Sequence, residues 1–187
     1  MALPRFFAAI VASIMLASSP VLADEIQEIR QQFEQRDLAG ALDLADRYLA
    51  KNPKNPQVRF LKSLILADQG KPDAAIAVLG ALTEDYPELP EPYNNLAVIH
   101  AEQGRYQDAL NALEMAIRAY PGYATAYENL GDIHAKMAAA AYEKALALDG
   151  KNKTAQAKLT LMRTLLDNQT IKPAAAQSLE TAPPQAR

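Results

Sequence analysis

The sequence predicts an all-α protein in which helical hairpins stack into a solenoid. Two observations carry this prediction: the same residue types recur every 34 positions, and the apolar residues between them follow helical spacing. Composition agrees, because the 187 residues are rich in alanine and leucine, include 7 glycines, and are 50% hydrophobic. That balance is typical of a folded chain and not of a disordered one.

The N-terminal segment, residues 1–23, has the pattern of a secretory signal peptide. Arg5 supplies the positive charge, an apolar run extends from Phe6 to Leu16, and the segment ends at Val21-Leu22-Ala23. We expect cleavage after Ala23 and export to the periplasm of a bacterial envelope; the alternative is an uncleaved N-terminal anchor. No later stretch is apolar for long enough to cross a bilayer, so no stable membrane insertion is expected after cleavage.

The repeated residues indicate where the two helices of each hairpin end and where they cross. A glycine is expected to end the first helix of a pair, because it adopts the left-handed cap conformation easily. A proline ends the second helix, since it lacks the N–H that continues the ladder. Recurrent alanines are expected where paired helices cross, because larger side chains would push the backbones apart. The recurring residues are Gly70 and Gly104; Pro53, Pro87 and Pro121; and Ala41, Ala75 and Ala109.

These residues resemble the tetratricopeptide repeat (TPR) family, with units at about residues 22–55, 56–89, 90–123 and 124–150. The first unit is divergent, and in the second Arg59 and Lys62 replace the usual aromatic residue and leucine. The third unit matches best, through Tyr93, Leu96-Ala97, His100, Gly104, Tyr106, Ala109, Leu113, Ala116 and Pro121.

The fourth unit begins like the third but loses five residues where the turn between its helices belongs. Gly150 stands 29 positions after Pro121, where the period requires 34. Because strong helix formers fill the remaining stretch, we predict one long helix over 125–148; the alternative is a tight turn near 137–140. A capping helix is expected within 151–168, and the Ala-, Pro- and Gln-rich residues 169–187 are expected to be disordered or a linker.

The composition includes few of the residue types and motifs that are usual in catalytic sites. The chain has no cysteine, a net charge of -3, and no glycine-rich phosphate-binding motif, so thiol chemistry, nucleotide cradles and nucleic-acid binding are not expected. His100 and His134 share one repeat position and are interpreted as packing residues, and carboxylates such as Glu91 as parts of solvated helix faces. We therefore predict a protein that is not an enzyme and needs no cofactor or metal.

The resemblance implies a concave groove lined by the first helix of each unit. Its middle is apolar and its C-terminal end acidic, and it lacks the Lys, Asn and Arg clamp with which some relatives hold a C-terminal carboxylate. The alternative for Phe60 is a place in the core. The residues carried over are Arg30, Phe33, Glu34, Phe60, Leu64, Asp68, Asn94, Val98, Glu102, Glu128, Asp132 and Lys136.

These observations favour a scaffold or adaptor of the cell envelope that binds another protein or peptide, one with apolar anchors and basic residues. One alternative is a periplasmic chaperone that holds unfolded clients. Another is an interaction module of a larger enzyme or of a secretion or export complex. The groove is alternatively only solvated, or filled by the protein's own tail.

Overall fold

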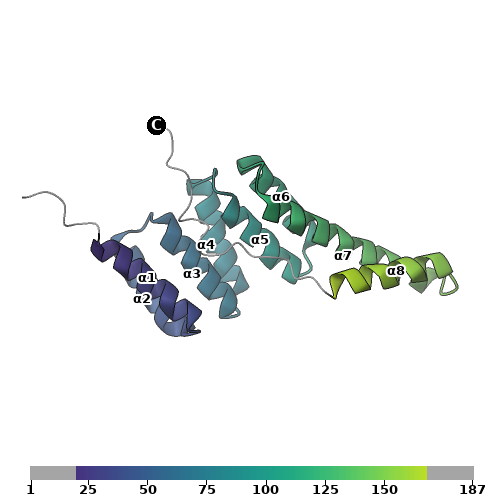
Figure 1. The fold of residues 1–187 in the computed structure, drawn as a ribbon, viewed down its shortest axis with the longest axis horizontal. Helices are drawn as coiled ribbons and strands as arrows, with labels where there is room; N and C mark the ends of the chain where they lie inside the picture. Colours follow the sequence, from purple (N-terminus) through teal and green to yellow (C-terminus); the bar gives the residue numbers. More distant parts are fainter. Residues whose placement is uncertain (1–19, 168–187) are drawn as a thin grey trace, which may run out of the picture.

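The computed structural model describes residues 20–167, a range that folds into helices joined by short loops. Figure 1 shows the helices in an elongated array that follows the order of the chain. Each helix packs mainly against its neighbours in sequence, which confirms the predicted all-α hairpin solenoid. The helices are α1 (Pro20–Glu34), α2 (Leu38–Lys51), α3 (Pro56–Asp68), α4 (Pro72–Asp85), α5 (Pro90–Glu102), α6 (Tyr106–Ala119), α7 (Ala124–Leu148) and α8 (Lys153–Leu166).

The turns inside the first three hairpins share one backbone conformation. Gly70 and Gly104 have φ angles of 71° and 72°, as predicted for glycines that end a helix. At the same place in the first hairpin, Arg36 has a φ of 64°, so a residue other than glycine adopts the left-handed backbone conformation there. The amide after each of these residues closes the turn; for example, Arg105 N donates to His100 O at 2.8 Å.

Proline and polar caps set the boundaries between hairpins. Pro53, Pro87 and Pro121 each follow the C-cap residue of a second helix, as predicted. The Asn55 side chain caps α3 by accepting a hydrogen bond from Val58 N at 2.9 Å. Asn152 caps α8 in the same way, through Ala155 N at 2.9 Å.

The core runs along the array as three neighbouring clusters of apolar side chains. Ala41, Ala75 and Ala109 are each 0% exposed and belong one to each cluster. Their complete burial agrees with a place where paired helices approach closely. Each cluster joins side chains from successive helices, so the stability of one hairpin depends on its neighbours.

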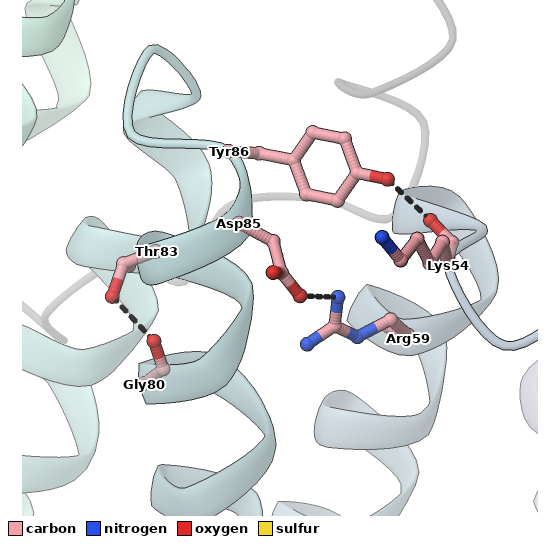
Figure 2. A network of polar contacts seen from close by, with 6 residues as sticks. All are labelled: Lys54, Arg59, Gly80, Thr83, Asp85 and Tyr86. Atoms are coloured by element: carbon pink, nitrogen blue, oxygen red, sulfur yellow. Dashed lines mark hydrogen bonds and ion pairs between the residues drawn. The ribbon is translucent and has the colours of Figure 1, made fainter.

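The two departures from the repeat pattern in the second unit are accommodated by ion pairs. Arg59, at the place of the usual aromatic residue, reaches across the hairpin and contacts Asp85 of α4 at 2.5 Å, as Figure 2 shows. Lys62, at the place of a leucine, contacts Asp46 of α2 at 2.6 Å. In the same region, the Tyr86 hydroxyl donates to the carbonyl of Lys54 at 2.5 Å and so ties α4 to the loop before α3 (Figure 2).

The fourth unit contains one continuous helix, which confirms the prediction from the missing turn. α7 runs for 25 residues from Ala124 to Leu148 without a break. Its first half packs against α6, and α8 folds back along it through Ala155 and Leu159, both buried. Figure 1 shows α7 and α8 extending from one end of the array.

The segments predicted as signal peptide and tail lie almost wholly outside the described residues. Of the predicted signal peptide, residues 20–23 fall within the first turn of α1. The tail at 169–187 is not described. Among the helices of residues 20–167, none combines the length and the apolar character needed to cross a membrane.

Candidate functional site

The surface predicted to bind a partner is formed by the first helix of each unit, α1, α3, α5 and α7, and is called here the first-helix surface. Its predicted residues differ in exposure. Arg30, Phe60, Asn94, Val98 and Asp132 are buried, Phe33, Leu64 and Lys136 are half-buried, and Glu34, Asp68, Glu102 and Glu128 are exposed.

Every exposed member of this set is acidic, and each first helix contributes one. Glu34 ends α1, Asp68 ends α3, Glu102 ends α5, and Glu128 lies near the start of α7. Asp68 forms an ion pair with Arg36 of the preceding turn. The first-helix surface therefore presents negative charge to solvent at several points along its length.

The position of Phe60 decides between the two alternatives left open by the sequence. Its side chain is 0% exposed and belongs to the core cluster that includes Leu66, Ala75 and Leu79. Phe60 is therefore a core residue and does not line the first-helix surface. The apolar members of the predicted set that remain partly exposed are Phe33 and Leu64, both half-buried, whereas Val98 is buried at 6% exposure.

Asparagine side chains join α5 to α7 beneath this surface. Asn129 Nδ2 donates to Asn94 Oδ1 at 2.8 Å, and both residues are 0% exposed. Asn94 Nδ2 in turn approaches Asn95 Oδ1 at 3.5 Å. A buried amide pair fixes the relative position of the two helices, because separating it would leave polar atoms without partners. Asn129 is absent from the predicted set, although its recurrence one repeat period after Asn95 was a usable signal.

Glu91 and Asp132 are not parts of a solvated helix face, so this interpretation from sequence was wrong for both carboxylates. The two carboxyl groups belong to residues that are 8% and 7% exposed. Burial raises the pKa of Glu91, an effect that a backbone hydrogen bond partly opposes. Burial and the nearby charge of Glu91 raise the pKa of Tyr123 to about 12, while a hydrogen bond with Thr125 acts in the opposite direction. Glu91 at the start of α5 and Tyr123 just before α7 are thus close enough to interact electrostatically, and the pKa of each is raised.

The two histidines differ although they share one repeat position. His100 is half-buried in α5, and burial lowers its pKa, helped by the charge of Arg105 and opposed by Asp108. His134 is exposed, contrary to the predicted packing role, because the continuous α7 has no second helix of its own folded over it. Within residues 20–167, no three His, Cys, Asp or Glu side chains lie close enough to share a metal ion.

The sequence matches the family model of the tetratricopeptide repeat over residues 32–99 and again over residues 66–130. Together the two matches span more than half of the chain. No curated protein matches the sequence significantly.

Solved structures share the fold at low sequence identity. A crystal structure of MamA is 23% identical with a TM-score of 0.56, covering 78% of this chain and 84% of that one. A tetratricopeptide repeat protein from Parabacteroides merdae ATCC 43184 is 20% identical with a TM-score of 0.57, covering 78% and 61%. The structure of Naa15/Naa10 bound to HypK-THB is 18% identical with a TM-score of 0.54, covering 79% of this chain but 23% of that one. At these identities the likeness shows the fold alone, whereas the family-model matches over half of the sequence show that this chain belongs to the tetratricopeptide repeat family.

Proposed function

We propose that this protein is a non-enzymatic interaction scaffold that binds a peptide or protein segment along the first-helix surface. The observation that carries the proposal is the ordered row of first helices, each with one exposed acidic side chain, together with the half-buried apolar Phe33 and Leu64. Stacked hairpins present extended surfaces of this kind, and membership of the family supports a role in protein–protein interaction. The Naa15/Naa10 structure, a protein assembly bound to HypK-THB, supports the same role for the fold.

The chemistry of the surface points to a basic partner with apolar anchors. Opposite charge raises the association rate and orients the encounter, while apolar side chains provide affinity after contact. Because Asp132 is buried, its charge is less available to a partner than those of Glu102 and Glu128. Those two exposed carboxylates are therefore the better targets for a test.

We also propose that the chain is exported to a bacterial cell envelope and that its signal peptide is removed after Ala23. The pattern of Arg5, the apolar run that follows, and Val21-Leu22-Ala23 supports this location. Fractionation of the native host followed by N-terminal sequencing tests it. A mature chain that begins at Asp24 is expected, and an intact N-terminus in the cytoplasm would contradict the proposal.

Crosslinking in the native host, followed by binding measurements with the purified partner, tests the scaffold proposal. One or two partners in fixed stoichiometry are expected, whereas many unrelated clients would instead indicate a chaperone. Reversing the exposed charges with Glu102→Lys and Glu128→Lys is expected to slow association by about tenfold at low salt. The matched control reverses Glu84 and Glu114, which are exposed on the second helices α4 and α6, and should leave the rate unchanged.

Two outcomes would contradict the scaffold proposal. Equal loss of binding in the first-helix and second-helix variants would show that only total charge matters. Unchanged binding in the first-helix variant would remove this surface as the site. The measurement is repeated with a chain that ends at Asp167, because the predicted tail is the alternative occupant, and tighter binding by the shortened chain would identify it as a competitor.

A further inference from the structure

The first half of α7 exposes a face that is covered in the preceding hairpin. Tyr93 of α5 is 8% exposed and packs in a cluster with Ala109 and Leu113 of α6. Tyr127 holds the same place in α7, one repeat period later, yet it is 50% exposed. The difference arises because α6 folds back over α5, whereas α7 continues straight past the point where a turn would reverse it.

Gly131, one helical turn further along this face, is likewise left uncovered. Its equivalent in α5 is Ala97, which is 0% exposed beneath α6. Gly131 itself is exposed, and a Cβ atom added to it would meet no atom within 4 Å. A small residue suits a close helix crossing, but within the described chain no side chain or backbone atom approaches this glycine in that way.

The second half of α7 carries the face that would complete the crossing. When the five missing residues are allowed for, Ala138 and Tyr142 correspond to Ala109 and Leu113 of α6. The two α6 residues are 0% exposed, whereas Ala138 and Tyr142 are half-buried. Part of the cover on Tyr142 comes from α8, whose Lys158 Nζ lies 5.6 Å from the centre of the Tyr142 ring. The first half of α7 thus carries one face of a hairpin interface, and the second half carries the other. Because α7 is one continuous helix, the two faces cannot contact each other within one chain.

We propose that two copies of this chain pair through α7 by exchanging these halves, so that each copy supplies the second helix that the other lacks. Two antiparallel α7 helices would place Tyr127 of one copy against Tyr142 of the other, and Gly131 against Ala138. The two-fold axis then passes near His134, and each interface is the same patch on both copies, as closed two-fold dimers require.

This pairing explains why the exposed face occurs in the fourth unit alone among the four units described. The first three hairpins cover the equivalent faces within one chain, and the loss of five residues is the change that prevents it in the fourth. Exchange of identical elements forms a dimer at low energetic cost, because the contacts made are those of the closed hairpin. The inference does not depend on the proposed binding function of the first-helix surface.

Sedimentation equilibrium or light scattering of the purified chain tests the proposal over a range of protein concentrations. The expected mass is that of two chains. Insertion of a copy of Gly104–Asp108 between Met137 and Ala138 restores the missing turn and is expected to halve the mass. The matched control inserts the same five residues between Gly150 and Lys151, in the loop before α8, and should remain a dimer.

A point substitution guards against an insertion that fails to fold. Gly131→Glu has open space in the single chain and is expected to give a helical monomer. Ala140→Glu places the same side chain at an exposed position on the opposite side of α7 and should leave the dimer intact. Circular dichroism verifies that both variants keep their helical content.

Disulfide trapping distinguishes exchange from a bend within one chain. The sequence contains no cysteine, so Tyr127→Cys combined with Tyr142→Cys introduces the only two thiols. On one continuous helix these positions lie about 22 Å apart, too far for a disulfide within the chain. Oxidation is therefore expected to link two copies covalently. A wild-type monomer at all concentrations, or a disulfide confined to one chain, would overturn the proposal and leave this face to another protein or to residues 168–187.

Discussion

Replacing Ala109 with glutamate places a carboxyl group at the closest approach of α5 and α6. The alanine is 0% exposed and lies in the cluster with Tyr93, Ala97 and Leu113. Extra volume in a packed core costs about 1–3 kcal/mol, because neighbouring side chains must leave their preferred rotamers. A carboxyl group buried there without a partner costs roughly 2 kcal/mol more even when it is protonated. The sum, about 3–5 kcal/mol, is a large part of the total stability of about 5–15 kcal/mol that is usual for a domain.

Urea unfolding followed by far-ultraviolet circular dichroism measures this loss. Asn111→Glu is the matched control, since it adds the same side chain to an exposed position two residues further along α6. The control is expected to stay within about 0.5 kcal/mol of the wild-type protein. If Ala109→Glu unfolded at the same urea concentration as this control, the assignment of Ala109 to a helix crossing would be refuted.

Three further predictions follow from single features of the structure. Gly104→Ala should lower the free energy of unfolding by about 1 kcal/mol because the φ of Gly104 is 72°, whereas Gly80→Ala, inside α4, should raise it by about 0.5–1 kcal/mol. A Cβ atom meets no atom within 4 Å at either position, so urea unfolding of the two variants isolates the effect of the backbone conformation. Equal shifts in the two variants would contradict this prediction. Because burial raises the pKa of Glu91, the contribution of Glu91 to stability should be complete below pH 4.5 and fall as the pH rises through the raised pKa. Glu91→Gln should remove this decline when the free energy of unfolding is measured against pH. An unchanged pH profile in the variant would argue against a raised pKa. Asn94→Ala and Asn129→Ala should each destabilise the protein by about 1–3 kcal/mol, and their double-mutant cycle should show a coupling energy of at least about 0.5 kcal/mol. Additive losses would mean that the 2.8 Å hydrogen bond between the two side chains contributes nothing to stability.

The fold was predictable from sequence because prolines and glycines mark the ends of its helices at a fixed period. The absence of five residues in the fourth unit likewise predicted that α7 continues to Leu148. Arg36 was not predictable as a left-handed turn residue, because the glycine that marks this place in the next two units is absent.

The first-helix surface was less predictable than the fold. The repeat period assigns side chains to a helix face but does not say how deep they lie, and depth depends on how closely neighbouring hairpins approach. Phe60 therefore proved to be a core residue, and Glu91 proved to be buried. Asn129 was missed although it lies one repeat period after Asn95, because the period does not show that its side chain bonds to Asn94 of the neighbouring unit.

In the proposed function, a partner binds the first helices and not the second. A photo-crosslinking side chain placed at Asp68 or Glu102, both exposed at the ends of first helices, measures this directly in the native host. The matched positions are Ala81 and Glu114, which are exposed on α4 and α6. We expect one partner to be captured from the first-helix positions and none from the second-helix positions. Capture from Ala81 and Glu114, with none from Asp68 and Glu102, would contradict it.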